Sequence, residues 1–140
     1  MGYDTQFMIQ VLRHLATEPP IGDMTGAEDV AAALNGVVGG DVFSVYQRSE
    51  LMLISRLDSQ LLAEPVLACS GITWYDREDD LDRVSTLFPT LELWVVGLGD
   101  DALFGDVWCQ VFLNGRHTPK LYRWNMLWSM DQSEMQRLRR

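Results

Sequence analysis

The sequence contains few of the residues that build metal centres, disulfide frameworks or nucleophilic active sites. Its 140 residues include two cysteines and two histidines. Cys69 and Cys109 are not part of a C-x-x-C motif, and neither has a histidine at the spacing of a zinc ligand set. The pattern therefore predicts two reduced thiols, with no structural disulfide, no metal and no cofactor.

Long apolar segments are also lacking. No run of about 18 uninterrupted apolar residues is present, which argues against a membrane-spanning helix. Residues 1–6 have neither the basic region nor the apolar region of a secretory signal peptide. We therefore expect a soluble cytoplasmic protein that does not act at a membrane.

Basic residues are few and unevenly placed. The formal net charge is −9, and Lys120 is the single lysine. Residues 1–113 contain 18 acidic and 5 basic residues, whereas residues 114–140 contain 2 acidic and 6 basic residues. Because nonspecific nucleic-acid binding depends on Lys and Arg side chains that neutralise phosphates, the acidic part excludes a general nucleic-acid-binding platform.

The length and the 47% hydrophobic content predict a single α+β domain over residues 1–140. Residues 4–13 alternate in polarity, with Phe7, Ile9 and Val11 on one side, which predicts a strand with one buried face. The two prolines at positions 19 and 20 predict a loop after this strand.

A first helix is predicted over residues 26–36. Thr25 and Glu28 match a T-x-x-E capping box, and Gly36 stands where a glycine would end the helix. Further on, polarity patterns and turn residues predict a hairpin of strands 42–46 and 51–55, although the second run also fits a helix that continues through Leu57, Leu61 and Leu62. After the hairpin they predict strand 66–75, helix 77–87, strand 91–96, turn 97–101, strand 107–113, an Asn114-Gly115 turn, a returning strand 116–123 and helix 125–138.

These elements predict a mostly antiparallel or mixed sheet with two helices on one face and a helix at the C-terminus. Two stretches also resemble a loose group of uncharacterised small phage and bacterial proteins. The first is the opening M-G-Y-D-T, and the second runs from W-Y-D-x-E-D-D through G-D-V-W to F-x-N-G. The resemblance covers about half of the chain and implies a partly ferredoxin-like region containing a split β-α-β unit. It also implies an origin in phage or mobile-element genomes and carries over no catalytic residue.

Acidic residues gather in two neighbouring segments, and we interpret them as a partner-binding surface. They are Asp76, Glu78, Asp79, Asp80, Asp82, Asp100, Asp101 and Asp106. Such a patch attracts basic partner surfaces and accelerates association. The alternatives are a solvated helix face that complements the helix dipole and a divalent-metal site, although the D-x-[DN]-x-[DN]-G pattern of a calcium loop is absent.

Two other groups of residues have a structural and a functional interpretation. Cys109 or Cys69 with His117 would form a nucleophile and base, although cysteines in apolar strands usually pack as small hydrophobes. The aromatic residues Tyr122, Trp124 and Trp128 lie beside basic residues near the C-terminus. They would either pack the last helix on the sheet, bind a partner protein or stack on nucleic-acid bases. The last arginines, Arg137, Arg139 and Arg140, are interpreted as a frayed end whose charge stabilises the C-terminus of the helix.

The leading functional hypothesis is a non-enzymatic protein that binds a larger bacterial protein, or a protein–nucleic acid complex, through a basic surface of that partner. Together with the resemblance, this predicts a phage or mobile-element inhibitor of a bacterial defence system, of anti-CRISPR type, in the host cytoplasm. The hypothesis predicts no direct contact with nucleic acid. The alternatives are a toxin-immunity protein and a small hydrolase-type enzyme that uses Cys109 and His117.

Overall fold

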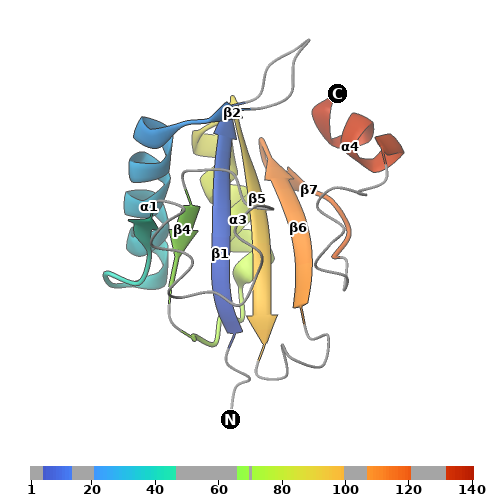
Figure 1. Ribbon diagram of the computed structural model, residues 1–140. Coiled ribbons are helices and arrows are strands. Elements are labelled where there is room, and N and C mark those ends of the chain that lie inside the picture. Colours follow the sequence, from blue (N-terminus) through green and yellow to red (C-terminus); the bar gives the residue numbers. More distant parts are fainter. Residues whose placement is uncertain (1–4, 14–20, 47–65, 70, 100–106, 121–131) are drawn as a thin grey trace.

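A computed structural model describes residues 5–13, 21–46, 66–69, 71–99, 107–120 and 132–140 (Figure 1). The elements in chain order are β1 (Thr5–Arg13), β2 (Ile21–Gly22), α1 (Met24–Val38), β3 (Ser44–Tyr46), β4 (Val66–Ala68), α3 (Arg77–Leu87), β5 (Leu91–Gly99), β6 (Val107–Leu113), β7 (Arg116–His117) and α4 (Gln132–Arg139). The predicted α+β class is confirmed, including a helix at the C-terminal end.

The strands form one antiparallel sheet. Its order is β3-β4-β1-β5-β6-β7, and β2 pairs with the end of β1. Strand β4 lies between β1 and β3, and strand β1 lies between β4 and β5. The units β1-α1-β3 and β4-α3-β5 therefore interlock, each with a strand of the other unit between its own strands. This is the ferredoxin-like β-α-β-β-α-β arrangement, extended here by β6 and β7.

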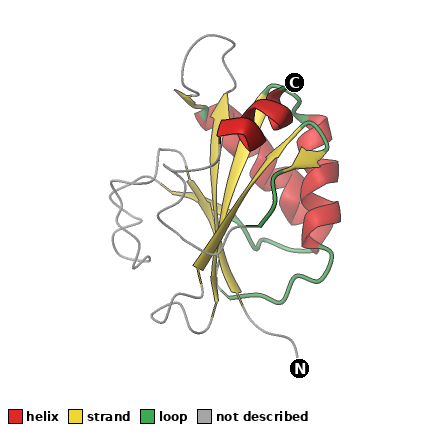
Figure 2. Cartoon of the chain, turned by 90° about the vertical axis from the view of Figure 1, so that its right-hand side faces the viewer, coloured by secondary structure: helices red, strands yellow, loops and turns green. Residues whose placement is uncertain are grey.

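Helices α1 and α3 cover one face of this sheet, as predicted (Figure 1, Figure 2). The core beneath them, called here the helix-side core, contains Leu34 of α1 and Leu81 of α3 together with Phe7, Leu93 and Phe112 from three strands. All five side chains are at most 2% exposed. Burial of such side chains typically contributes about 1.5–3 kcal/mol each to folding.

The opposite face of the sheet has its own core, called here the α4-side core. Strand residues such as Met8, Val96 and Val111 pack there against Met135 and Leu138 of α4. Strand side chains alternate between faces, so neighbouring residues of one strand belong to different cores. The prediction that β1 has a single buried face is therefore wrong. Strand β1 is paired along both edges, and both of its faces are covered.

Helix α1 begins earlier and ends later than predicted. Its N-cap is Asp23, whose carboxylate accepts a hydrogen bond from the Gly26 backbone N–H at 2.9 Å. That bond, together with hydrogen bonds from Arg13, holds the pKa of Asp23 below its ordinary value. The predicted capping box is wrong because Thr25 already lies within the helix, which continues through Gly36 to a left-handed C-cap at Gly39.

Helix α3 matches its predicted bounds, whereas the strands around it differ in length. Strand β4 ends at Ala68, and Ile72 forms an isolated bridge with Thr5 instead of continuing the strand. Strand β5 extends into the first three residues of the predicted turn 97–101 and ends at Gly99, because it pairs with β1 over nine residues. Gly97 fits this strand because the Trp108 indole of β6 lies directly on it, where a side chain would collide.

The Asn114-Gly115 turn is confirmed. Both residues have positive φ, 48° and 80°, and β6 and β7 pair on either side of them. The returning strand is shorter than predicted, since β7 comprises Arg116 and His117 only. Beyond β7, the Thr118 hydroxyl accepts a hydrogen bond from the Val111 N–H, so a side chain takes part in the pairing.

Two predicted elements lie wholly or partly outside the described residues. Residues 47–65 include the second strand of the predicted hairpin, and β3 instead pairs with β4. Residues 121–131 include the beginning of the predicted C-terminal helix, of which α4 represents the end. Among the described helices, none is long and apolar enough to cross a membrane.

The contact between Gly97 and Trp108 predicts opposite effects of alanine at two glycines. Gly97→Ala should lower the free energy of unfolding by at least about 1–3 kcal/mol, because the new methyl group overlaps the indole. Gly36→Ala is the matched control: its site is open, so it should stabilise helix α1 by about 0.5–1 kcal/mol. Urea unfolding measures both changes, and equal effects at the two sites would contradict the packing described.

Candidate functional site

The acidic segment predicted as a partner-binding surface forms the N-terminal end of α3. Asp76 is the N-cap residue, and Glu78, Asp79 and Asp80 lie in the first turn. Carboxylates at this end are stabilised by the partial positive charge of the helix N-terminus. Tyr75 precedes the helix with 83% of its surface exposed, so an aromatic ring stands beside the acids.

The structure divides these acids into two groups. Asp76 and Asp79 are exposed. In contrast, Asp80 is half-buried and accepts a hydrogen bond from the Trp74 indole N–H at 2.8 Å. The exposed pair therefore faces solvent, while Asp80 helps to fix the chain entering the helix against the helix-side core.

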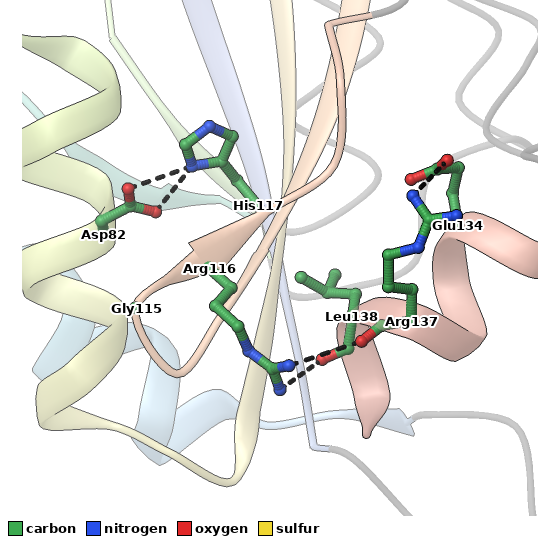
Figure 3. A pocket seen from close by; sticks show the side chains of 7 residues that line it. All are labelled: Asp82, Gly115, Arg116, His117, Glu134, Arg137 and Leu138. Atoms are coloured by element: carbon green, nitrogen blue, oxygen red, sulfur yellow. Dashed lines mark hydrogen bonds and ion pairs between the residues drawn. The ribbon is translucent and has the colours of Figure 1, made fainter.

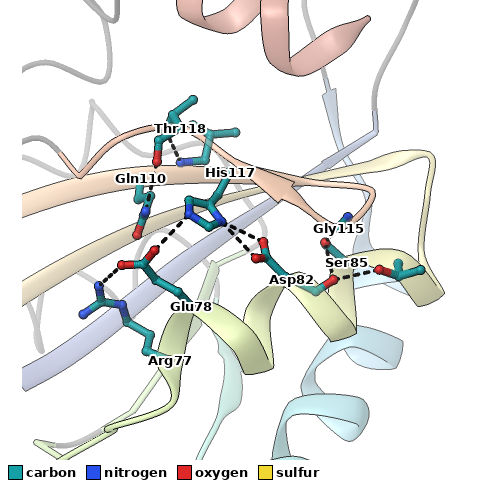
Figure 4. A network of polar contacts seen from close by, with 10 residues as sticks. Arg77, Glu78, Asp82, Ser85, Gln110, Gly115, His117 and Thr118 are labelled. Carbon is teal, nitrogen blue, oxygen red and sulfur yellow. Dashed lines mark hydrogen bonds and ion pairs between the residues drawn. The ribbon is translucent and has the colours of Figure 1, made fainter.

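Glu78 and Asp82 are held by His117 of β7 (Figure 4). The imidazole Nε2 lies 2.9 Å from Glu78 Oε2, and Nδ1 lies 2.9 Å from Asp82 Oδ1. Both carboxylates are satisfied when both ring nitrogens carry protons. The ring also rests against Phe112, with centroids 5.2 Å apart. His117 thus joins the edge of the sheet to α3, and two of the predicted site residues serve this internal contact.

Trp108 of β6 makes a second contact between the sheet and α3. The guanidinium carbon of Arg77 lies 4.3 Å from the centroid of the Trp108 ring, and Lys120 Nζ lies 4.8 Å from it. Such cation–π contacts contribute roughly 0.5–1 kcal/mol at exposed sites and more when desolvated. Arg77 also approaches Glu78, at 3.5 Å. Helix α3 is therefore anchored to the sheet along its polar side as well as by its apolar residues.

The hydroxyl of Ser85 links α3 to the hairpin turn (Figure 4). It donates to the Asp82 carbonyl oxygen at 2.8 Å and accepts from the Gly115 N–H at 2.8 Å. Ser85 is completely buried. Its hydroxyl is committed to these two bonds, so its role at this site is structural.

A cavity of about 350 Å³ adjoins this network (Figure 3). It is lined by residues of α3, the hairpin and α4: Asp82, Gly115, Arg116, His117, Glu134, Arg137 and Leu138. Arg116 donates to the carbonyl oxygens of Leu138 at 2.7 Å and Arg140 at 2.6 Å, and thereby caps the C-terminal end of α4. Glu134 pairs with Arg137 at 2.9 Å. The charged groups around the cavity are thus paired with one another or with backbone.

An ion pair between the half-buried Arg139 and a buried carboxylate fixes α4 to the sheet. Arg139 donates to both carboxylate oxygens of Glu92, at 2.8 and 3.0 Å, and the Trp94 indole N–H donates to the same carboxylate at 3.0 Å. Glu92 is fully buried on β5. The interpretation of Arg139 as part of a frayed end is therefore wrong. The sequence shows no local sign of this pair, because 47 residues separate its members.

Cys109 is buried on β6, and Cys69 is buried directly after the end of β4. Cys109 belongs to the α4-side core, whereas the His117 ring rests on Phe112 of the helix-side core, so Cys109 and His117 lie on opposite faces of the sheet. Cys69 belongs to the helix-side core, but strands β1, β5 and β6 separate the end of β4 from β7, which carries His117, so this alternative pair is also apart. Burial raises the pKa of both the Cys69 and the Cys109 thiols to about 11. Both thiols are therefore protonated at neutral pH.

Several predicted functional residues lie outside the described part of the chain. These are Asp100, Asp101 and Asp106 of the acidic surface and the aromatic residues Tyr122, Trp124 and Trp128. Within the described ranges, no group of three or more His, Cys, Asp or Glu side chains is arranged to hold a metal ion.

Comparison with known proteins found no family model, no curated protein and no solved structure that matches this chain.

The raised thiol pKa values predict unreactive cysteines in the folded protein. A thiol-specific reagent at pH 8 should label neither Cys69 nor Cys109 until denaturant is added. The unfolded thiols ionise near their ordinary pKa of 9.0, whereas the folded ones retain their protons up to about 11. Stability should therefore fall as the pH rises between these values. Rapid labelling of native protein, with one mole of reagent incorporated, would contradict the burial described.

The ion pair between Arg139 and Glu92 predicts that replacing Arg139 lowers stability strongly, whereas replacing Arg137 in the same helix changes it little. Arg139→Met removes both guanidinium hydrogen bonds from the buried Glu92 carboxylate, so the free energy of unfolding should fall by about 3 kcal/mol. Arg137→Met is the matched control in the same helix, because Arg137 is 70% exposed, and it should change stability by no more than about 0.5 kcal/mol. Denaturant titration of both variants measures the difference, and similar values would contradict the assignment.

Proposed function

We propose that this chain is a non-enzymatic protein-binding protein whose acidic end of α3 engages a basic surface on a larger partner. The observation that supports this proposal is the exposed group Tyr75, Asp76 and Asp79 at that end. Tyrosine is enriched in protein interfaces because it supplies a rigid aromatic contact with a polar tip. Exposed carboxylates beside it attract cationic groups and align the partner.

The internal contacts of α3 support this role because they hold the exposed group in a fixed position. His117 and Trp108 tie the helix to the sheet on its inner side. A preorganised surface loses less conformational entropy on binding than a mobile one. Asp76 and Asp79 therefore project from a rigid support, and the overall net charge of −9 adds long-range attraction toward basic surfaces.

The state of the nucleophilic side chains described above favours binding over catalysis. Cys69 and Cys109 are buried and protonated, the Ser85 hydroxyl is committed to two hydrogen bonds, and both ring nitrogens of His117 contact carboxylates. None of these groups combines exposure with a free base, which nucleophilic catalysis requires.

In its more specific form, the proposal is that the partner is a bacterial defence protein, or its complex with nucleic acid, whose basic groove normally binds phosphates. An acidic protein seated on such a groove competes with nucleic acid for the same lysine and arginine side chains. The chain then acts as an inhibitor of anti-CRISPR type. This form depends on the identity of the partner, whereas the general form depends only on the exposed group at α3.

The general form predicts that reversing the charges of Asp76 and Asp79 abolishes capture of the partner protein, whereas reversing a control pair of exposed acids does not. Tagged protein is incubated with bacterial lysate at low and high salt, retained proteins are identified by mass spectrometry, and binding of the purified partner is measured. Asp76→Lys with Asp79→Lys should weaken binding by about a hundredfold or more, because two attractive contacts become repulsive. Glu28→Lys with Asp29→Lys, which reverses two exposed acids on α1, is the matched control and should leave binding within about threefold.

Equal loss with both double variants would indicate nonspecific charge attraction and would overturn the proposal, as would the absence of any retained protein at low salt. For the specific form, the purified partner is tested for nucleic-acid binding with and without this protein. Unimpeded nucleic-acid binding in the complex would overturn the inhibitor role and leave the general form intact.

A further inference from the structure

The sequence contains two Asn-Gly pairs, Asn35-Gly36 and Asn114-Gly115, and the structure places them in different environments. Asparagine followed by glycine is prone to spontaneous deamidation, because glycine has no side chain to hinder attack of its backbone nitrogen on the preceding side-chain amide. Two identical dipeptides in one chain separate the effect of folding from the effect of local sequence.

The first pair lies within helix α1, and its side-chain amide is held at both ends. The Asn35 Nδ2 donates to the Phe43 carbonyl oxygen at 3.0 Å, and Oδ1 accepts from the Val42 and Phe43 N–H groups at 3.0 and 2.7 Å. Gly36 is an interior residue of α1, so its nitrogen belongs to the helical hydrogen-bond ladder. The amide and the nitrogen can therefore meet only when this part of α1 unfolds.

The second pair forms the exposed tip of the hairpin between β6 and β7. Asn114 is exposed, and β7 contributes only two paired residues beyond the turn. In a type I′ turn the first central residue has a ψ angle of about +30°, which directs the next nitrogen away from the Cβ atom. Ring closure needs these atoms on the same side, so the turn reacts only after it opens. Opening a short hairpin costs less than unfolding a long helix.

Ser85 of α3 holds the turn in its unreactive form (Figure 4). The Gly115 N–H donates to Ser85 Oγ at 2.8 Å, and Ser85 is completely buried. Loss of the proton from this nitrogen and rotation of the Asn114 backbone both require that bond to break. Thr86 supplies a neighbouring hydroxyl that donates to the same carbonyl oxygen, that of Asp82, as Ser85 does, at 2.8 Å in each case. Among the described hydrogen bonds, Gly115 is joined to Ser85 and not to Thr86.

We infer that Asn114 is a site of spontaneous deamidation in the folded protein, and that release of Gly115 from Ser85 controls its rate. When the turn opens, the Gly115 nitrogen loses its proton to hydroxide, and its electron pair forms a bond to Asn114 Cγ. The bond between Cγ and Nδ2 then breaks, and Nδ2 leaves as ammonia after taking a proton from water. The product is a succinimide ring that joins the two residues.

Water then opens the ring at one of its two carbonyl carbons. Cleavage between the Gly115 nitrogen and Asn114 Cγ leaves aspartate at position 114, whereas cleavage between this nitrogen and the Asn114 carbonyl carbon leaves isoaspartate. Both products add a negative charge, and isoaspartate also adds one backbone atom to a two-residue turn. Because the turn length sets the register that pairs His117 with Phe112, isoaspartate weakens the docking of the hairpin on α3. The inference goes beyond the proposed function, since it uses no residue of the exposed group at α3.

The test measures deamidation at both pairs in the purified full chain. The protein is incubated at mildly alkaline pH and digested under acidic conditions at intervals, and mass spectrometry detects the conversion of each amide to a carboxyl group. In the native protein, Asn114 should react at least about tenfold faster than Asn35, because the hairpin opens more readily than α1. In urea sufficient to unfold the chain, the two rates should agree within about threefold, because local sequence alone then controls them.

Variants of the two neighbouring hydroxyls test the role of Ser85. Ser85→Ala removes the acceptor and should accelerate deamidation of Asn114 in the native protein by about fivefold, which corresponds to the loss of one hydrogen bond. Thr86→Ala removes the other hydroxyl bonded to Asp82 and should leave the rate within about twofold. The rate at Asn35 reports on the fold, since an unfolded variant would deamidate rapidly at this site as well.

Three outcomes would overturn the inference: equal rates at Asn114 and Asn35 in the native protein, no acceleration by Ser85→Ala in a folded chain, or equal effects of Ser85→Ala and Thr86→Ala. If Ser85→Ala fails to fold, Ser85→Cys makes the same comparison, because a thiol is a weaker acceptor of similar shape. Isoaspartate-containing protein, separated by ion exchange, should unfold at a lower temperature than the parent. An unchanged melting temperature would overturn the effect on the hairpin.

Discussion

The fold depends on the central position of β1, which is hydrogen-bonded along both edges. It pairs with β4 on one side and with β5 over nine residues on the other. Both faces of this strand are also covered, so its alternate side chains belong to two separate cores. Phe7 enters the core beneath α1 and α3, and Met8 enters the core beside α4. The positions of the helices, and hence of the acidic surface at α3, follow from this division.

Helix α3 connects the core to the proposed binding surface. Its apolar residues pack on the sheet, its inner acids bind His117, and its outer acids remain exposed. Similar carboxylates therefore have different roles according to the direction in which the helix presents them. Asp82 stabilises the hairpin contact, whereas Asp79, three residues earlier, faces solvent. The two ends of α3 also differ: one carries an exposed tyrosine with acids, and the other an exposed leucine beside a pocket.

Features that depend on short-range chemistry were predictable from the sequence. The bounds of α3 follow from its amphipathic spacing, and the Asn114-Gly115 turn follows from the requirement for positive φ. The same turn also predicts the position of His117, because a two-residue turn pairs His117 with Phe112 and so places it on the face covered by α3. The cap of α1 was missed because Asp23 is supported by Arg13, ten residues earlier, and the Glu92–Arg139 pair spans 47 residues.

The sequence by itself determined the α+β class, the acidic character, helix α3 and the Asn114-Gly115 turn, since periodicity and turn chemistry act over a few residues. Only the tertiary structure decided which acids remain exposed, because that depends on where His117 and Trp74 lie after folding. It also decided that Cys109 and His117 lie on opposite faces of the sheet. Side chains alternate along β6, but the core that each one enters is known only once the helices on both faces are placed. Burial and long-range pairing are properties of the assembled sheet, and local patterns do not specify them.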